Sequence, residues 1–315
     1  MRACSRCGKE AVTYLAYRGD HLCSAHFRGF VERRVRREVR EQGRIPRGSR
    51  VAVGVSGGKD SVTTLRLLHG ILAPRRDVTL VAVTVDEGIA AYRPAGIDIA
   101  RRTAEELGVA WSLVTYREEA GLTLDEIVAR KTEGLPCTFC GPLRRRSLNR
   151  AAREAGASHL ATGHNLDDVA QSVLMNTLRG DLGRMARLAP HAAPATGPRG
   201  APDGLVPRLL PLRSLPEREV ALYAILNGWE YHDGECPYAA GATRGRIRDM
   251  LLALEEAEPG TRHALASGGA RLAIALRAAA PADAPRAATC ASCGEPCASR
   301  ATICRGCEMI AALPR

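Results

Sequence analysis

The sequence lacks long apolar runs. None of its segments approaches the length that crosses a bilayer, and its first residues lack the charged, apolar and small-residue pattern of a signal peptide. We therefore expect no membrane partner and predict a cytoplasmic protein whose thiols stay reduced. In a reducing compartment, eleven cysteines indicate metal ligands or catalytic groups rather than disulfides.

Acidic residues are outnumbered. The 45 Lys and Arg residues exceed the 34 Asp and Glu residues, and the net charge of +11 lies mostly on arginine. Because the planar guanidinium suits phosphate binding and base stacking, nucleic acid is one expected partner. An arginine-rich surface that is merely solvated explains the charge equally well, and composition alone does not decide between these explanations.

Cysteines gather at both ends of the chain. Cys4-x2-Cys7 followed by Cys23-x2-His26 offers three thiolates and one imidazole, and Cys290-x2-Cys293 followed by Cys304-x2-Cys307 offers four thiolates. Two such pairs can close a tetrahedral zinc shell with no open position for a substrate. We therefore predict two structural Zn²⁺ sites. Cys297 lies inside the second module and is expected to take no part.

The middle of the chain has the pattern of an α/β domain. Val- and Leu-rich runs at 50–55, 77–85, 109–116 and 158–163 lack strict polar alternation, as strands covered on both faces do, and helical patterns separate them. These features predict a doubly wound parallel sheet. Before it, apolar residues every four positions from Phe27 to Val39 predict a helix with a strongly basic opposite face.

This pattern divides the chain into five segments. A Pro- and Ala-rich stretch at 277–289 predicts a linker, and the Ala-, Pro- and Gly-rich stretch 189–204 predicts a loop. The predicted segments are an N-terminal zinc module (1–26), a basic linking helix (27–48), a catalytic domain (49–276), the linker (277–289) and a C-terminal zinc module (290–315).

The stretch "VAVGVSGGKDS", residues 51–61, runs from a strand through a Gly-rich turn into a helix. Backbone amides of such a turn, with the helix N-terminus behind them, can bind phosphate, and Lys59 with the hydroxyls of Ser56 and Ser61 adds charge and hydrogen bonds. It is not a Walker loop, because Asp60 follows the lysine. The motif S-G-G-x-D-S resembles the loop of the N-type ATP pyrophosphatases (PP-loop proteins), which activate a carbonyl oxygen as an adenylate.

Further segments narrow the resemblance. "CTFCGPLRRRSLNRAA", "ATGHNLDDVAQSVLMNTLRGD", "HDGECPYA" and the terminal cysteine modules together resemble the tRNA 2-thiouridine synthetase family. In that family three cysteines hold a [4Fe–4S] cluster, and the resemblance assigns them to Cys137, Cys140 and Cys236. From the residues alone, zinc binding, a redox pair and a persulfide-carrying nucleophile remain alternatives, with Cys236 as a resolving thiol or a plain buried thiol.

The resemblance also implies the nucleotide site. Its ATP-binding positions include the loop, two positions lining the adenosine and one basic residue: Gly54, Ser56, Gly57, Gly58, Lys59, Asp60, Ser61, Val85, Gly163 and Arg144. Asp168 matches a catalytic aspartate, as a Mg²⁺ ligand or polarising group, and joins Lys59 and the three cluster cysteines as the implied catalytic residues. Without the resemblance, Asn165 predicts a helix cap, His164 a structural role, and Asp167 and Asp168 a favourable helix start.

The implied reaction is ATP-dependent 2-thiolation of a tRNA uridine, favouring position 34 over position 54. The implied partners are tRNA, a sulfur donor (a ubiquitin-like thiocarboxylate carrier or sulfide) and a second copy of the chain. The basic helix, Arg144–Arg146 and the terminal modules are expected to contact the tRNA backbone. Two alternatives stay open: a PP-loop amidating or tRNA-modifying ligase without a cluster, and a non-catalytic zinc-module RNA-binding protein.

Overall fold

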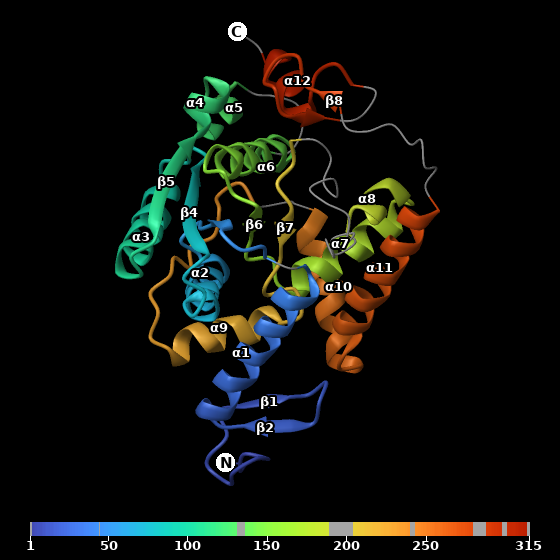
Figure 1. The fold of residues 1–315 in the computed structure, drawn as a ribbon. Coiled ribbons are helices and arrows are strands. Elements are labelled where there is room, and N and C mark those ends of the chain that lie inside the picture. Colours follow the sequence, from blue (N-terminus) through green and yellow to red (C-terminus); the bar gives the residue numbers. More distant parts are fainter. Residues whose placement is uncertain are drawn as a thin grey trace.

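A five-stranded parallel sheet forms the centre of the computed structural model, which describes residues 2–43, 45–130, 136–188, 204–239, 243–279, 288–297 and 301–313 (Figure 1). The strand order is β5-β4-β3-β6-β7, and every pair is parallel. The strands are β3 (Arg50–Gly54), β4 (Thr79–Asp86), β5 (Ala110–Thr115), β6 (His159–Ala161) and β7 (Arg208–Leu209). The predicted α/β fold with a parallel sheet is confirmed.

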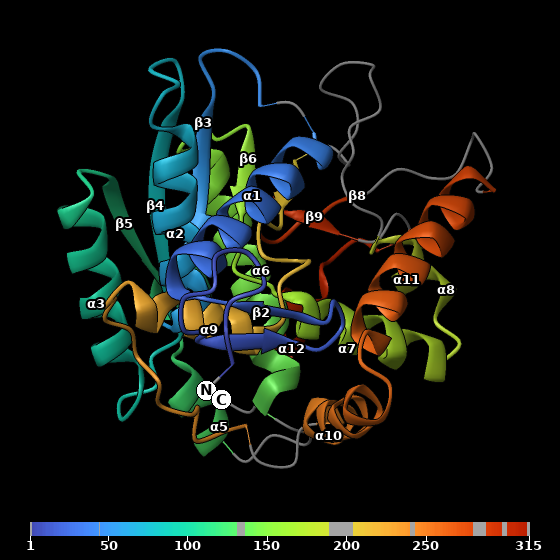
Figure 2. The same ribbon diagram turned by 90° about the horizontal axis from the view of Figure 1, so that it is seen from below.

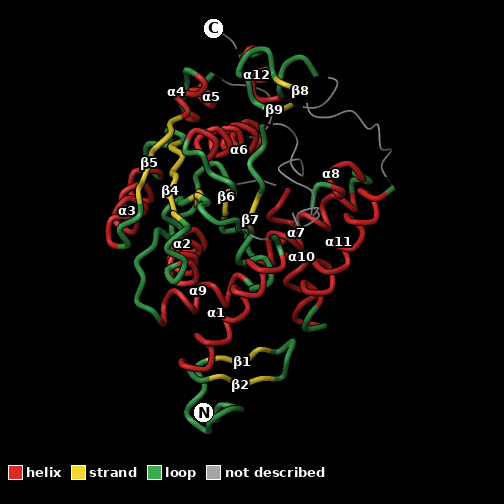
Figure 3. Tube along the Cα trace, viewed as in Figure 1, coloured by secondary structure: helices red, strands yellow, loops and turns green. Residues whose placement is uncertain are grey.

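Successive residues of the central strand are buried on opposite faces of the sheet. In β3, Val51 and Val53 pack in the cluster that includes α2 (Lys59–Leu72) and α3 (Arg93–Glu106), whereas Ala52 packs with α6 (Pro136–Glu154). None of the three strand residues is exposed. Burial on both faces explains why these strands read as continuous apolar runs rather than as an alternating pattern. Figure 3 shows the strands enclosed by helices.

The other helices cover the margins of the sheet, and α7, α8, α10 and α11 form a group at one side of it (Figure 2). The helix α11 packs against α7, α8 and α10. Their bounds are α1 (Ser24–Glu41), α4 (Tyr116–Ala120), α5 (Leu124–Ala129), α7 (Leu166–Leu178), α8 (Leu182–Ala186), α9 (Glu217–Leu226), α10 (Thr243–Ala257), α11 (Thr261–Ala278) and α12 (Arg305–Ala311). None of the helices in the described ranges is both long and apolar enough to cross a membrane.

A small cysteine module lies at each end of the molecule (Figure 1). The N-terminal one contains the antiparallel pair β1 (Thr13–Leu15) and β2 (Asp20–Leu22), and the C-terminal one contains β8 (Ala288–Thr289), β9 (Pro296–Cys297) and α12. The predicted basic helix starts inside the first module, at Ser24. Most of the predicted loop 189–204 and linker 277–289 lies outside the described residues.

Candidate functional site

The Gly-rich turn lies where the strand order of the sheet reverses direction. It follows β3, and the segment that carries Gly163 to Asp168 follows the neighbouring strand β6. In open parallel sheets, ligands bind beyond the carboxyl ends of the strands at such a switch point. Two segments that are about a hundred residues apart in sequence are therefore brought together where the fold favours a ligand.

Two glycines allow the turn to pack closely. Gly57 has a φ of +85°, and a Cβ there would lie 2.1 Å from the Gly96 carbonyl oxygen at the start of α3. A Cβ on Gly163 would lie 2.8 Å from the carbonyl carbon of Asp60. Side chains at either position would push these backbones apart, so both glycines set the shape of the turn.

Hydroxyl groups hold the turn from within. The Ser61 hydroxyl donates to the Gly58 carbonyl oxygen at 2.8 Å and accepts the Ser56 N–H at 3.0 Å. The Ser56 and Ser61 hydroxyls lie 3.1 Å apart. The turn is thus preorganised before any phosphate binds, although it is exposed at Ser56.

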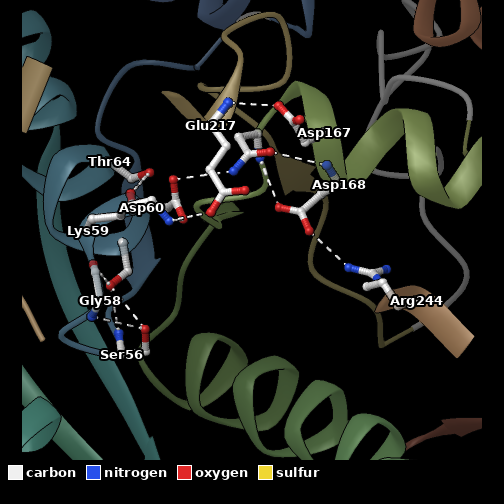
Figure 4. A network of polar contacts seen from close by, with 11 residues as sticks. Ser56, Gly58, Lys59, Asp60, Thr64, Asp167, Asp168, Glu217 and Arg244 are labelled. Carbon is white, nitrogen blue, oxygen red and sulfur yellow. Dashed lines mark hydrogen bonds and ion pairs between the residues drawn. The ribbon is translucent and has the colours of Figure 1, made fainter. Parts of the chain in front are cut away.

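Charged side chains cross the site from the turn to the next loop (Figure 4). Lys59 Nζ contacts Glu217 Oε1 at 2.6 Å and Asp60 Oδ2 at 3.2 Å. Burial alone would lower the pKa of Lys59, but the Asp60 and Glu217 carboxylates together have the larger effect, so the pKa of Lys59 is raised. Burial also raises the pKa of Asp60 to about 6, against the opposing effect of Lys59. Glu217, which begins α9 after Pro216, was not identified from sequence.

The segment after β6 places its acidic residues at the start of α7. Asn165 caps the helix as predicted: its side chain accepts the Asp168 N–H at 3.1 Å, and the Asp168 carboxylate accepts the Asn165 N–H at 3.2 Å. Asn165 also donates to Asp60 at 3.3 Å, which joins the two loops. The second Asp168 oxygen contacts Arg244 at 2.9 Å (Figure 4).

Asp167 and His164 have structural surroundings. Asp167 accepts the Glu217 N–H at 2.7 Å and pairs with Arg262, which fixes the start of α9. His164 contacts the Thr162 hydroxyl at 2.8 Å, and its side chain is otherwise exposed. The position of Asp168 beside the turn, facing Arg244, distinguishes it from both neighbours.

Cys140 and Cys236 pack in one apolar cluster, and Cys137 lies one helical turn before Cys140 at its exposed edge. Cys137 and Cys140 lie in the first turns of α6, while Cys236 lies in the segment after α9 and packs against the cluster that contains Cys140. Cys140 is buried, Cys236 is half-buried and Cys137 is exposed. The cysteines therefore extend from the interior to an accessible edge.

Polar groups surround the buried thiol. Arg144 Nη2 donates to Cys140 Sγ at 3.2 Å, and the Tyr116 hydroxyl lies 3.5 Å from the same sulfur. Burial raises the pKa of the Cys140 thiol, while Arg144 and Tyr116 favour the thiolate. The arrangement suits a sulfur that carries negative charge when it ligates a metal centre.

The segment 232–238 connects the turn to the cysteines. The His232 N–H donates to the Gly57 carbonyl oxygen at 2.8 Å. Four residues later comes Cys236, and the Tyr238 carbonyl oxygen lies 3.7 Å from Cys137 Sγ. One short segment therefore joins the Gly-rich turn, Cys236 and Cys137. The role of His232 had no sequence signal, because its contact is made through the backbone.

Val85 and Arg144 lie at the same edge of the sheet. Val85, near the end of β4, is 4% exposed. Arg144 Nε donates to Glu87 Oε1 at 2.6 Å, and Glu87 also pairs with Arg93. Neither Glu87 nor Arg93 was identified from sequence, although the sequence places both just after a predicted strand.

Both terminal quartets assemble as predicted. The ligand atoms of Cys4, Cys7, Cys23 and His26 all lie within 4.8 Å of one another, and so do those of Cys290, Cys293, Cys304 and Cys307. In the described residues, the three cysteines near the turn form no third group this compact. A single tetrahedral ion draws its ligands together, whereas a cubane binds each cysteine to a separate iron and needs them further apart.

The donor set fits a [4Fe–4S] cluster. Cys140 and Cys236 supply soft thiols from one apolar cluster, Cys140 receives a hydrogen bond from Arg144, and Cys137 is accessible. Cys297 belongs to neither quartet; its thiol contacts the Ala301 carbonyl oxygen at 3.2 Å.

Comparison with known proteins agrees with this geometry. Residues 31–255 match a family described as PP-loop domain, and residues 4–28 match 2-thiouridine synthetase TtuA, N-terminal LIM domain. The chain is 40% identical to tRNA 2-thiolation protein NcsA of Haloferax volcanii over 98% of both chains. It is 41% identical to cytoplasmic tRNA 2-thiolation protein 1 of Bos taurus over 99% of this chain and 88% of that protein.

A solved structure is similar over its whole length. It is described as U34-tRNA thiolase NcsA from Methanococcus maripaludis with its [4Fe-4S] cluster. The TM-score is 0.82 with 32% sequence identity, and the match covers 100% of this chain and 97% of the other.

Proposed function

The chain belongs to the PP-loop family of tRNA 2-thiolation proteins, and on that premise we propose that it is an ATP-dependent tRNA uridine 2-thiolase. The reaction replaces the C2 oxygen of a uridine with sulfur. We favour uridine 34, the position named for the similar archaeal thiolase. We also propose that the protein is cytoplasmic, as the name of the bovine relative states for that protein.

One observation carries the proposal. The segment that donates its His232 N–H to the Gly57 carbonyl oxygen continues directly to Cys236 and to the carbonyl oxygen beside Cys137. A nucleotide on the turn and a sulfur species at the thiols would therefore face the same substrate base. This juxtaposition suits a reaction that needs adenylation and sulfur transfer at one carbon.

The nucleotide steps follow from the turn. Backbone amides of the turn and Lys59 hold the phosphates of ATP and stabilise the charge that develops on pyrophosphate as it leaves. The uridine C2 oxygen attacks the α-phosphorus, the bond to the β-phosphate oxygen breaks, and the base becomes adenylated. Mg²⁺ accompanies the ATP, and Asp168 with Asp60 supplies carboxylate oxygens of the kind it prefers. Arg244, which contacts Asp168 at 2.9 Å, would have to release that carboxylate for it to serve as a ligand.

The sulfur steps use the cysteines. Cys137, Cys140 and Cys236 would hold the [4Fe–4S] cluster, which supplies an iron without a protein ligand where sulfide can bind. Arg144 and Tyr116 keep the buried Cys140 sulfur hydrogen-bonded. When a sulfur nucleophile adds at C2, AMP departs with the former C2 oxygen. The target base must leave its stack to reach this site.

The remaining groups would bind zinc, tRNA and protein partners. Each terminal quartet would take one Zn²⁺ in a closed tetrahedral shell, which suits a structural role. The exposed arginines of α1, with Arg144 and Arg145, would contact tRNA phosphates. Arg146, which was expected to join them, is instead buried, where it pairs with Glu119 and donates to Cys307 Sγ. The sulfur donor is either a thiocarboxylate carrier or sulfide, and a homodimer is the expected assembly. The five segments drawn from the sequence remain part of this proposal.

Substitution of Cys236 tests the cluster and the activity together. We expect Cys236→Ala, purified without oxygen, to lose the broad visible absorbance of the cluster and tRNA thiolation. Cys297→Ala is the matched control, because Cys297 lies outside both quartets and the site; it should keep both properties. An unchanged anaerobic spectrum in Cys236→Ala would refute the ligand assignment.

Two measurements separate the alternatives. A cluster-free preparation that still modifies tRNA would favour a ligase without a cluster. If tRNA does not stimulate AMP release from ATP, the chain is a non-catalytic RNA-binding protein instead. Nucleoside analysis of the treated tRNA then identifies the modified base, and 2-thiouridine at position 34 is the expected product.

A further inference from the structure

Glu87 lies between two arginines at the edge of the nucleotide site. On one side, Arg93 Nε contacts Glu87 Oε2 at 2.6 Å. The same arginine donates from Nη1 to the Ser56 carbonyl oxygen at 3.1 Å and from Nη2 to the Val85 carbonyl oxygen at 2.6 Å. Glu87 is therefore tied, through Arg93, to the phosphate-binding turn and to the end of β4.

The other oxygen of Glu87 reaches towards the cysteines. Glu87 Oε1 accepts from Arg144 Nε at 2.6 Å, and Arg144 Nη2 donates to Cys140 Sγ at 3.2 Å. A continuous series of charged contacts thus runs from the turn to the buried cluster cysteine. Glu87 is the one carboxylate in that series.

The two arginines differ in exposure. The side chains of Glu87 and Arg93 are 4% and 5% exposed, whereas that of Arg144 is 48% exposed. A buried carboxylate without partners is costly, so Glu87 and Arg93 form a fixed pair. The exposed part of the Arg144 guanidinium can still meet a ligand. Arg144 is the member of the series that can change its contacts.

The backbone also fixes Glu87. Its carbonyl oxygen accepts the Leu124 N–H at 2.7 Å. The next residue, Gly88, has a φ of +69°, and a Cβ there would lie 2.5 Å from the Thr123 side chain. Glu87 is thus held through its main chain on one side and through its carboxylate on the other.

We propose that Glu87 is a positioning residue that holds Arg144 between the nucleotide and the Cys140 sulfur, so that ATP occupancy and the electronic state of the cluster are coupled. The inference rests on the proposed function. Hydrogen bonds to cluster sulfurs set reduction potentials. When Arg144 turns hydrogen bonds towards a phosphate, its contact with Cys140 changes, and the potential changes with it. By linkage, the state of the cluster then alters nucleotide affinity equally.

The experiment uses full-length protein with its cluster, prepared without oxygen. The affinity for a non-hydrolysable ATP analogue is measured by calorimetry, and the cluster's midpoint potential and electron paramagnetic resonance spectrum are recorded with and without the analogue. We expect the analogue to shift the potential of the parent protein. Glu87→Gln should bind the analogue about tenfold more weakly, as expected for one misplaced charged hydrogen bond, and should lose that shift.

Glu119→Gln is the matched control. Glu119 of α4 is 6% exposed and pairs with Arg146 and Arg150, which lie on α6, the helix that also carries Arg144. In the described part of the chain, its ion pairs reach neither the turn nor Cys140. Because this variant loosens α6 without touching Arg144, it should keep the analogue affinity and the shift. Equal losses in both variants would show a general loosening of α6 and overturn the proposal.

A variant of Arg144 tests whether Glu87 acts through it. In an Arg144→Gln background, adding Glu87→Gln should change neither analogue affinity nor potential further. Additive losses would overturn the inference, as would a parent protein that binds the analogue without a shift. A parent protein that binds no nucleotide would instead refute the proposed function. If the parent protein binds the analogue with a shift in potential, and Glu87→Gln keeps that shift, only the inference about Glu87 is refuted.

Discussion

At the scale of single residues, Glu219 is a carboxyl group held away from water. It lies on α9, beside Tyr17 of the N-terminal module, and is 4% exposed. Burial raises its pKa to about 7, although Tyr17 and nearby arginines, including Arg34, oppose that effect. Its Oε2 atom has no hydrogen-bond partner in the described residues. The folded chain therefore favours the protonated form of Glu219.

This environment predicts a pH-dependent effect of Glu219→Gln. The pKa is higher in the folded chain than the unfolded value of 4.5. The stabilising contribution of the protonated group is complete below about pH 4.5 and is lost as the pH rises through about 7. The variant does not titrate at this position. Its free energy of unfolding should therefore rise relative to that of the parent between pH 5 and pH 8, by on the order of 1–3 kcal/mol, and its melting temperature should rise with it.

The control for this prediction is the exposed residue Glu230, whose side chain is 63% exposed and pairs with Arg102. Thermal unfolding of Glu230→Gln and Glu219→Gln is followed across the same pH range. Glu230→Gln should show no gain at high pH. A Glu219→Gln curve parallel to that of the parent would contradict the argument.

Residues whose role depends on local geometry could be predicted from sequence, and those that depend on long-range contact could not. Asn165 was identified as a cap because a cap is defined by the residues that follow it. Glu217 meets Lys59 from a distant part of the chain, and Glu87 acquires its role only when α6 brings Arg144 beside it. No local pattern marks either carboxylate.

At the scale of elements, helix α6 supports both the cysteines and the C-terminal module. Its first turns carry Cys137 and Cys140. Further along, Arg146 donates to Cys307 Sγ at 3.4 Å, and Asn149 donates to Glu295 at 2.7 Å. The C-terminal module therefore packs through buried polar contacts on the helix that carries two of the three proposed cluster cysteines.

Disruption of the C-terminal quartet should loosen that helix. In a variant with Cys290→Ser and Cys293→Ser, we expect amide hydrogen exchange in α6 to speed up about tenfold or more, the result of losing on the order of 1.4 kcal/mol of local stability. Mass spectrometry of exchanged peptides measures it. The matching pair Cys4→Ser and Cys7→Ser should leave α6 unchanged. Unaltered exchange in α6 after the C-terminal change would count against a supporting role.

Elements were more predictable than their packing. The continuous apolar runs identified four of the five sheet strands, because most parallel strands are buried on both faces. The two-residue strand β7 gave no such signal and was not predicted. The four-residue spacing from Phe27 to Val39 identified the buried face of α1. The docking of the C-terminal module on α6 had no sequence signal, since Arg146, Asn149 and Glu295 are polar and read as surface residues.

At the scale of the whole molecule, the net charge of +11 predicts salt-sensitive tRNA binding. If about four phosphates are neutralised, affinity should fall about a hundredfold for a fourfold rise in salt. Arg36 and Arg40 are exposed on α1 and form no ion pair within the described part of the chain. Arg36→Gln with Arg40→Gln should therefore flatten the salt slope by about two phosphate contacts. Arg101→Gln with Arg102→Gln removes equal charge from arginines paired on α3 and should leave the slope nearly unchanged. Filter binding across a salt series measures both; equal slopes in the two variants would mean that overall charge, and not the face of α1, attracts the tRNA.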